Sequence, residues 1–295
     1  MYNGAIEAGG TKFVCAIGTP SGEIVDKVTL PTTGPEETLQ KVVDFFAAYQ
    51  INRLGVGSFG PIDLNKDSNT YGTILNTPKQ LWKGYDLLGA LQRELSVPVY
   101  LDTDVNAAAL GEYRWGAAQG ARSVLYITVG TGIGAGFVKD GRTFIGRQHP
   151  EMGHIKVEQH PEDRFTASCP YHGNCLEGLA SGTAIHDRYG RAGTSLPEND
   201  PVWEMTAYYL AQAIVNYSLV LAPEQIILGG GVMKQERLYE LIRNKVSTAM
   251  NGYMDLPVLE EYITAPALLD EQGIKGALAL IPADTDKYQK VPDFL

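Results

Sequence analysis

The sequence predicts an α/β protein of duplicated architecture with two domains, and three observations lead to this fold class. Short β-like runs alternate with amphipathic helical segments after an opening group of strands, which is typical of α/β domains with a mixed sheet. A strand, a glycine-rich turn with a threonine and a second strand occur together twice, within Gly4–Lys12 and within Leu125–Val138. A chain of 295 residues is also long enough to bury more than one core. We therefore expect domains over residues 1–119 and 120–295, with the last helix able to pack back on the first domain.

The first half of the chain is expected to open with an antiparallel meander and to continue with alternating helices and strands. The β-like runs of the meander cover residues 2–8, 12–18 and 23–30. A helix over 35–49, a buried strand over 54–59 and a long loop to Gly84 follow. A second helix then ends at Leu95, and a strand over 98–101 leads into an alanine-rich helix.

The second half is expected to begin with the hairpin at 125–138. An irregular segment rich in His, Cys, Pro and Gly covers 141–178, and such a long connection is usually functional or held by a metal. Helices are predicted over 180–189, 201–221, 235–250 and 270–281, and strands over 225–228 and 258–264. The tail, residues 284–295, is expected to be loosely ordered.

Composition and charge argue against several classes of partner. A net charge of −10 and a pI near 5.0 disfavour a nucleic-acid or anionic-membrane surface, because both require a basic field. The longest apolar segment, 207–222, is interrupted by polar residues and falls short of the roughly 20 apolar residues of a membrane span, so we predict a buried helix. No export signal is recognisable, and an odd set of three cysteines suits a reducing compartment, so we expect cytoplasmic residence.

The hairpin at 125–138 carries four alternating glycines and a threonine at its tip. Gly130, Gly132, Gly134 and Gly136 lack side chains, so the backbone can reach positive φ and lie against a ligand. The spacing also satisfies a relaxed dinucleotide fingerprint, but that motif needs a helix to follow at once, whereas here a second strand follows. The residues alone leave a phosphate-binding loop and an ordinary glycine-rich hairpin as equal alternatives, and Thr131 would add a hydroxyl to the former.

Two other glycine-containing turns are candidates for the same ligand. Gly9 and Gly10 precede Thr11 and Lys12, where a lysine beside backbone amides can hold a phosphate, although a solvated edge lysine explains it equally. Three glycines, Gly229, Gly230 and Gly231, stand where a strand is predicted to meet a helix, with Lys234 nearby. The flat base and ribose of a nucleotide can lie there, and tight packing of strand on helix is the alternative.

An aspartate at the end of a predicted strand is the candidate general base. Asp102 and Asp104 stand two residues apart at the end of this strand, and we expect only one of them to enter a cleft. We choose Asp104, because Asn106 and the start of the helix would orient it, and a carboxylate at such a position can accept a proton from an attacking hydroxyl. The structural alternative is that Asp104 only caps the helix.

The sharpest local signal is a set of four soft or borderline metal ligands. Cys169, His172 and Cys175 follow one another at intervals of three residues, and His154 lies upstream. Four nitrogen and sulfur ligands suit tetrahedral zinc, and a site with four protein ligands is structural because no position stays open. The alternative is two buried thiols and two surface histidines.

Two glutamates would be drawn together by that metal. Glu151 precedes His154 by three residues, and Glu177 follows Cys175 by two. Carboxylates fixed near one another can accept hydrogen bonds from a polyol, whereas without the metal both are more simply solvent-facing.

Taken together, these segments resemble the ROK family of sugar kinases and repressors, which share the duplicated, actin-like (ribonuclease H-like) ATPase fold with two α/β domains around a cleft. Gly9–Lys12 is similar to the first phosphate loop of the family, Gly130–Gly134 to the second and Leu228–Val232 to the adenosine segment. Thr103–Glu112 resembles the catalytic sugar segment, and Glu151–His154 with the Cys/His cluster resembles the metal-braced sugar site. The resemblance covers residues 2–281.

The resemblance implies a sugar kinase that uses ATP and magnesium and contains a structural zinc. A histidine inside the cluster resembles the fructokinase branch, so D-fructose is the expected substrate and fructose 6-phosphate the product. Asp104 would be the general base, and Glu7 would stand near the water shell of the metal. The sugar would be held by Asn76, Thr103, Asp104, Glu151, His154 and Glu177. Thr103 replaces the asparagine that the family commonly has before the catalytic aspartate.

Alternative functions differ in substrate or in class. A kinase for glucose, mannose or an N-acetylated amino sugar is the nearest, because the residues do not rank these hexoses. A sugar-sensing repressor would need an N-terminal helix-turn-helix, and here the first hairpin begins within ten residues of Met1. A non-catalytic sugar-binding protein would keep Glu151 and Glu177 without phosphorylating anything. The partners are therefore a small sugar and ATP, with no nucleic acid and no membrane, and the family resemblance suggests a homodimer.

Overall fold

The structure, a computed structural model, describes residues 2–283, and the tail predicted to be loosely ordered lies outside the described residues. The chain forms two compact units, the first made of the chain up to Gly111 and from Asp270 on, the second of Glu112–Leu269. The change from one unit to the other falls within helix α3 (Asp104–Trp115), whereas the sequence placed a boundary shortly after it, near Gln119.

The first unit is built on a mixed sheet of five strands in the order β3-β2-β1-β4-β5. β1 and β3 are antiparallel to β2, and β1, β4 and β5 run parallel to one another. The strands are β1 (Tyr2–Ala8), β2 (Lys12–Gly18), β3 (Ile24–Pro31), β4 (Ile51–Ser58) and β5 (Val99–Thr103). The predicted meander is confirmed, and the parallel strands follow it as the alternating pattern indicated.

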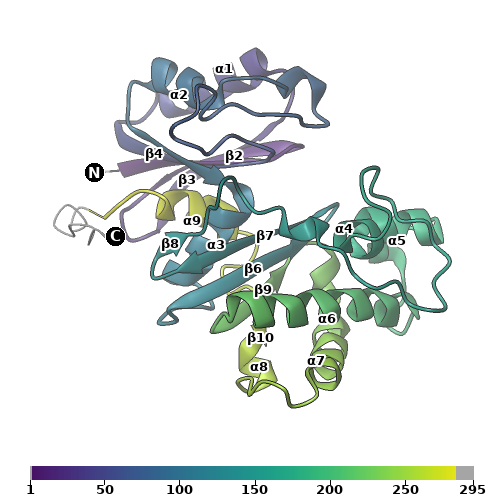
Figure 1. Cartoon of the computed structure of the whole chain (residues 1–295). Helices are drawn as coiled ribbons and strands as arrows, with labels where there is room; N and C mark the ends of the chain where they lie inside the picture. The colour runs from purple at the N-terminus through teal and green to yellow at the C-terminus, as the bar shows by residue number, and fades with distance from the viewer. Residues whose placement is uncertain (1, 284–295) are drawn as a thin grey trace. The chain divides into compact units, whose positions relative to one another are not determined.

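Helices lie on both faces of this first sheet (Figure 1). They are α1 (Pro35–Phe46), α2 (Leu87–Leu95), the first part of α3, α9 (Gln272–Ala279) and the short 3-10 helix η1 (Gln80–Trp82). Glycines at the contacts let α9 approach the sheet closely. A Cβ on Gly55 of β4 would lie 1.8 Å from the carbonyl oxygen of Ala277 in α9. A Cβ on Gly276 would lie 1.9 Å from the carbonyl oxygen of Ala107 in α3. The last helix therefore packs on the first sheet.

The second unit repeats the same sheet. Its strands are arranged in the order β10-β9-β6-β7-β8, so each strand occupies the place of its counterpart in the first sheet. β6 and β7 are antiparallel, as are β7 and β8, while β9 runs parallel to β6 and to β10. The strands are β6 (Ser123–Val129), β7 (Ile133–Lys139), β8 (Arg142–Thr143), β9 (Gln225–Gly229) and β10 (Ile263–Thr264). The predicted duplication is confirmed.

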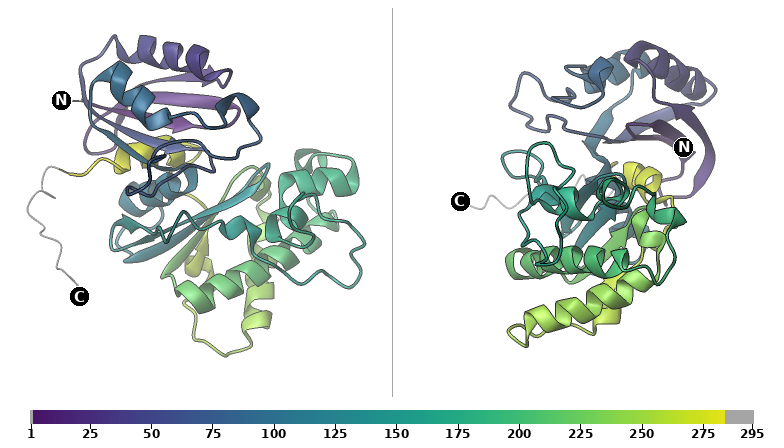
Figure 2. Two further views of the ribbon diagram at one scale, coloured as in Figure 1. Left: turned by 45° about the horizontal axis from the view of Figure 1, so that its top comes forward. Right: turned by 90° about the vertical axis from the view of Figure 1, so that its right-hand side faces the viewer.

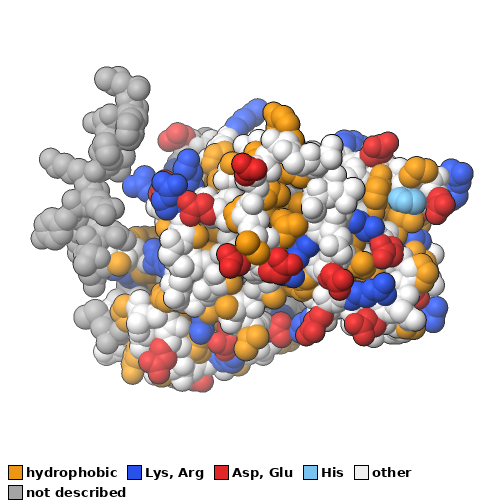
Figure 3. Space-filling model, turned by 90° about the horizontal axis from the view of Figure 1, so that it is seen from below, with side chains coloured by type: hydrophobic (Ala, Val, Ile, Leu, Met, Phe, Trp, Pro, Cys, Tyr) orange, Lys and Arg blue, Asp and Glu red, His pale blue; other side chains and the backbone are white. Residues whose placement is uncertain are grey.

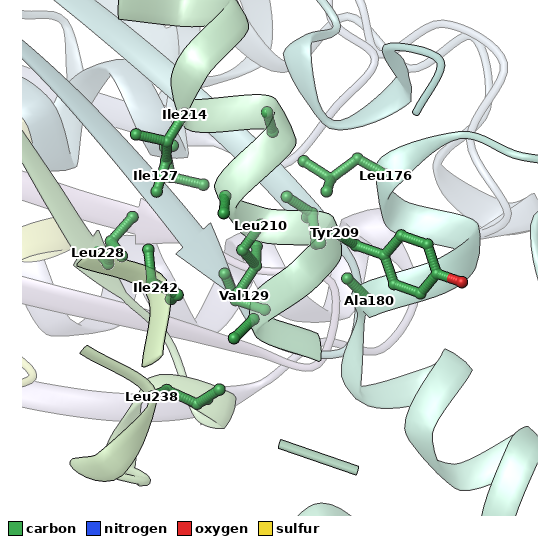
Figure 4. Packing of buried hydrophobic residues seen from close by; sticks show 14 of the residues in the cluster. Ile127, Val129, Leu176, Ala180, Tyr209, Leu210, Ile214, Leu228, Leu238 and Ile242 are labelled. Atoms are coloured by element: carbon green, nitrogen blue, oxygen red, sulfur yellow. The ribbon is translucent and has the colours of Figure 1, made fainter. Parts of the chain in front are cut away.

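The helices of the second unit cover its sheet with apolar side chains. They are α4 (Leu176–Ala180), α5 (Gly182–Tyr189), α6 (Val202–Leu221), α7 (Arg237–Met250) and α8 (Leu259–Tyr262), with 3-10 helices η2 (Met152–His154), η3 (Gly193–Ser195) and η4 (Val232–Lys234). α6 and α7 pack side by side (Figure 2). In Figure 4, side chains of β6, α4, α6, β9 and α7 meet in one core. The apolar segment 207–222 is thus the buried helix α6, as predicted.

The predicted strand over 258–264 is wrong for most of its length. Residues 259–262 form one turn of helix, α8, and only Ile263 and Thr264 pair with β9. The turn places Tyr262, which is 1% exposed, in the core, where its hydroxyl oxygen lies 2.8 Å from that of Ser218 in α6. Apolar residues in a short run fit either a helix or a strand, so the pattern of this segment did not distinguish them.

The charged surface and the hydropathy of the helices agree with what the composition predicted. On the face shown in Figure 3, acidic and basic side chains are interspersed, as expected for a chain of net charge −10 without a basic field. Within residues 2–283, none of the helices combines the length and the hydropathy that crossing a membrane requires.

Candidate active site

In the first unit, the turn between β1 and β2 holds the predicted first phosphate loop. The amide of Gly9 donates to the carbonyl oxygen of Lys12 at 2.9 Å, which closes the turn. The hydroxyl of Thr32 donates to the carbonyl oxygen of Gly9 at 2.7 Å and so fixes the turn from the end of the neighbouring strand β3. The side chains of Thr11 and Lys12 are exposed, which leaves the tip available to a ligand.

Glu7, in β1 below this turn, lies in a space that a glycine makes. A Cβ on Gly273 of α9 would lie 2.3 Å from the carboxyl carbon of Glu7, so a larger residue there would displace the Glu7 side chain. Burial raises the pKa of Glu7, and the charge of Lys12 partly opposes that rise. A carboxylate in such surroundings gains from a nearby cation, which is the property that a magnesium-binding role would use.

The candidate general base, Asp104, is the first residue of α3. Its Oδ1 accepts from the amide of Val105 at 2.9 Å, which fixes the carboxylate at the start of the helix. The capping position belongs to Thr103 instead, because the hydroxyl oxygen of Thr103 accepts from the amide of Asn106 at 3.2 Å. The carboxylate of Asp104 still bonds the first turn of the helix, so its role as general base remains a prediction.

Of the two groups expected to orient Asp104, the start of the helix does so, whereas the side chain of Asn106 binds another carboxylate. Asn106 is fully buried and its side-chain amide donates to Oδ1 of Asp102 at 2.7 Å, not to Asp104. Asp102 is itself 3% exposed and also accepts from the amide of Thr103. Its role is therefore structural, at the end of β5. The two aspartates lie in different surroundings because β5 ends at Thr103 and Asp104 already belongs to α3, so the expected continuation of the strand to Asp104 is wrong.

Two further candidate sugar contacts also lie in the first unit. Thr103 is 4% exposed and its hydroxyl already serves as the helix cap, so a sugar contact from this side chain remains a prediction. Asn76 is exposed in the loop that precedes η1 and follows the isolated bridge between Ile62 and Ile74. Its side chain is thus open to a ligand, and its contact with a sugar also remains a prediction.

In the second unit, the turn between β6 and β7 is held from two sides. We call residues Gly130–Gly132 the phosphate turn. The amide of Gly182 donates to the carbonyl oxygen of Gly130 at 2.7 Å, and the hydroxyl of Thr183 donates to that of Thr131 at 2.8 Å. On the other side, Oε2 of Glu177 accepts from the amide of Ile133 at 2.9 Å. The side chain of Thr131 is exposed at the tip.

The glycines of this hairpin do not adopt the positive φ angles that the sequence suggested. Positive φ angles occur at several glycines of the described chain, but not at Gly130, Gly132, Gly134 or Gly136. A Cβ on Gly132 would lie 2.5 Å from Oε2 of Glu177, so a side chain there would displace that carboxylate. Around Gly130 the space is open, which suits the close approach of a ligand to the backbone.

Three glycines stand at the end of β9, and the last of them, Gly231, lines a pocket within the second unit. Gly230 has a φ of +91°, and a Cβ there would lie 2.5 Å from the carbonyl oxygen of Val129 at the end of β6. Gly231 borders open space. The short helix η4 follows, and α7 begins only at Arg237, later than the predicted helix start. The pocket has a volume of about 760 Å³, and its lining includes Thr131, Thr183, His186, Trp203, Gly231 and Lys234.

The four predicted metal ligands are brought together. One ligand atom from each of His154, Cys169, His172 and Cys175 lies within 4.8 Å of the others, and we call these residues the metal cluster. The Sγ of Cys169 lies 3.5 Å from Nδ1 of His172 and 3.8 Å from Nδ1 of His154. The Sγ of Cys175 lies 3.6 Å from the same Nδ1 of His154.

These separations fit a tetrahedral zinc site. Zinc bonds of about 2.3 Å to sulfur and about 2.0 Å to nitrogen place neighbouring ligand atoms roughly 3.5 to 3.8 Å apart in a tetrahedron. Two sulfur and two nitrogen donors also match the preference of zinc. If His154 binds the metal through Nδ1, its Nε2 stays free of the metal and lies 3.7 Å from Oε1 of Glu177.

We expect about one zinc per chain in protein purified without chelators, because all four donors converge. Cys169→Ser should reduce the bound zinc strongly, since it removes a thiolate from the cluster. Cys15→Ala is a matched control: Cys15 is equally a buried free cysteine, but it lies in β2 of the first unit. Elemental analysis of the three proteins checks this, and a zinc-free wild type would contradict the assignment.

The predicted glutamates lie beside the metal cluster. Glu151 directly precedes η2, and the amide of His154 donates to its carbonyl oxygen at 3.0 Å. Burial raises the pKa of Glu151, His154 opposes the rise and the charge of Glu177 adds to it. Gly153 lets η2 lie on β7, because a Cβ there would be 1.7 Å from the carbonyl oxygen of Ile133.

A buried network that sequence analysis did not indicate supports the irregular segment before the metal cluster. Asp163 is 8% exposed, accepts from the hydroxyl of Tyr209 in α6 at 2.6 Å, and pairs with Arg188 of α5 at 3.0 Å. Burial acts to raise the pKa of Asp163, but the hydrogen bonds from Tyr209 and the backbone, together with Arg188, lower it overall. In Figure 4 the Tyr209 hydroxyl points away from the apolar side chains of the core. The partners are far apart in sequence, so no local pattern reveals them.

These features define a class of protein: a duplicated α/β fold of the actin-like ATPase type, with a glycine and threonine turn at corresponding hairpins of both sheets. The sequence pattern of the ROK family matches residues 3–284, and the chain belongs to the ROK family.

Three similar proteins illustrate the relationship. A putative fructokinase of Bacillus subtilis (strain 168) is 50% identical over 281 residues, which cover 94% of each chain. The fructokinase of Pediococcus pentosaceus is 46% identical over 283 residues, 96% of this chain and 98% of the relative. Among solved structures, a ROK family glucokinase from Streptomyces griseus in complex with glucose and AMPPNP has a TM-score of 0.76 at 25% identity, covering 95% of this chain and 99% of that one.

Proposed function

We propose that this chain is a fructokinase that transfers the γ-phosphate of ATP to the primary hydroxyl of D-fructose and gives fructose 6-phosphate and ADP. One observation in the second unit carries the proposal: the carboxylate of Glu177 borders both the phosphate turn and the metal cluster. In this proposal, the element that binds phosphate and the element that binds the sugar are adjacent. Near full-length similarity to a named fructokinase supports the choice of hexose.

Asp104 acts as the general base in this proposal. Its carboxylate, fixed at the start of α3, accepts the proton as the sugar hydroxyl attacks phosphorus. The amides and hydroxyls of the two turns, with Lys12, stabilise the phosphoryl oxygens. Magnesium, when bound with the nucleotide, supplies further charge neutralisation, and Glu7 is the carboxylate that would face its water shell. Gly231 and Lys234 line the pocket proposed for adenosine, and Gly229 and Gly230 precede Gly231 in the chain.

The sugar is held by groups beside the metal cluster. Glu151 and Glu177 offer carboxylate oxygens to sugar hydroxyls, and His154 offers Nε2 while its Nδ1 faces the cluster. The zinc proposed for the cluster is structural, because four protein donors leave no open position. Its task is to keep His154 and the start of α4 in place. Asn76 and Thr103 complete the proposed set of sugar contacts.

A sugar panel tests the proposal. ADP release with ATP is measured for fructose, glucose, mannose and an N-acetylated amino sugar. We expect kcat/KM for fructose to exceed that for the other sugars by tenfold or more, roughly the discrimination that about 1.4 kcal/mol provides. A preference for another hexose would transfer the assignment to that kinase activity. If no sugar stimulates ADP release, the chain is a non-catalytic sugar-binding protein.

A further inference from the structure

The phosphate turn is fixed by one continuous stretch of chain, Glu177–Thr183, that joins α4 to α5. The carboxylate of Glu177 accepts a hydrogen bond from the amide of Ile133, just after the turn. The amide of Gly182 donates to the carbonyl oxygen of Gly130. The hydroxyl of Thr183 donates to the carbonyl oxygen of Thr131. Between these contacts, Ser181 is 1% exposed and its hydroxyl oxygen accepts from the amide of Ala184 at 3.1 Å, which starts α5. The stretch therefore grips both sides of the turn.

The same stretch begins at the metal cluster. Cys175 is the residue that caps α4, and its Sγ accepts from the amide of Gly178 at 3.4 Å. Leu176 and Ala180 of α4 are fully buried in the core that also holds Val129 of β6, as Figure 4 shows. A displacement of Cys175 would consequently move Glu177, which lies two residues further on, relative to the phosphate turn.

We propose that Glu177 and Thr183 are positioning residues for the nucleotide phosphates, and that through them the phosphate turn is coupled to the metal cluster. The inference rests on the proposed kinase function. The hydroxyl of Thr183 fixes the carbonyl oxygen of Thr131, and the carboxylate of Glu177 fixes the amide of Ile133 and lies next to Gly132. The metal cluster then serves nucleotide binding as well as sugar binding.

Thr183→Val removes the hydroxyl and keeps the shape of the side chain. We expect the KM for ATP to rise about fivefold, the value of one net hydrogen bond, while the KM for fructose stays within about twofold. Thr183→Ser should restore the wild-type value. Thr248→Val is the matched control, because Thr248 on α7 likewise donates to a carbonyl oxygen, that of Asn244 at 2.9 Å. An unchanged KM for ATP in Thr183→Val would overturn the positioning role.

Glu177 separates positioning from sugar contact. In Glu177→Gln the side-chain carbonyl oxygen can still accept from Ile133, so only the KM for fructose should rise. In Glu177→Ala the acceptor is lost, so the KM for ATP should rise as well. If both variants changed the KM for fructose alone, Glu177 would have no part in nucleotide binding. Wild-type protein that is inactive on every sugar would instead refute the proposed function, which is a separate outcome.

The coupling to the metal cluster has its own readout. By reciprocity, a nucleotide that binds more tightly when the cluster is intact must also protect the cluster. In an equilibrium competition with a chelating dye, the wild-type protein is therefore expected to bind zinc several-fold more tightly when ADP saturates the site. This gain in zinc affinity should shrink in Thr183→Val at equal ADP saturation. A zinc affinity that ADP leaves unchanged, or the absence of zinc from the protein, would refute the coupling.

Discussion

Asp104→Asn is expected to lower kcat about 10²- to 10⁴-fold, the range that general-base catalysis usually contributes. The substitution removes the proton acceptor and little else, because asparagine has the same shape and its Oδ1 can still accept from the amide of Val105. The KM values for ATP and fructose should change far less than kcat. Steady-state kinetics with a coupled ADP assay measures all three quantities.

The control for this variant is Asp67→Asn. Asp67 is an exposed aspartate in a loop of the same unit, where its backbone amide is bonded to Asn65. This variant should match the wild type in every parameter. Turnover by Asp104→Asn within about tenfold of the wild type would show that another group accepts the proton, and the assignment of Asp104 would be wrong.

Sequence patterns predicted the parts of the fold and site that local chemistry determines. The two hairpins carry their strands, glycines and threonines within short segments, so period and turn residues were enough to infer a duplicated sheet. Cys169, His172 and Cys175 form a compact motif, and their ligand types and spacing alone indicated the metal site. The strand predicted over 12–18 is likewise confirmed as β2, and Cys15 within it is fully buried.

The sequence did not reveal contacts between distant segments. Asn106 was expected to orient Asp104, but the amide turns to Asp102, because strand β5 ends one residue before the helix and buries that carboxylate. The hydrogen bond from Thr183 to Thr131 joins residues 52 positions apart, and no local sequence pattern indicates it. Helix and strand also compete for short apolar runs such as 258–264, where packing of Tyr262 decided the outcome.

Gly153→Ala is expected to destabilise the second unit by about 3 kcal/mol, at the upper end of the cost of overpacking. The added Cβ would lie 1.7 Å from the carbonyl oxygen of Ile133 and 2.7 Å from its carbonyl carbon. These are backbone atoms of β7, so no rotamer change can relieve the clash, and η2 must move away from the strand. Since η2 carries His154, the variant should also bind less zinc and use fructose with a higher KM.

Gly173→Ala is the matched control, because Gly173 lies in the same irregular segment, between two metal ligands, with nothing within 4 Å of an added Cβ. It should leave the thermal midpoint and the zinc content unchanged. Gly153→Ala should lower the thermal midpoint by about 6 to 12 °C, as expected for a loss of this size. Equal midpoints for the two variants would mean that η2 does not rest on β7 as described. A lower midpoint with full zinc content would show that the strand moves and the metal cluster stays, so His154 would keep its place by its metal bond alone.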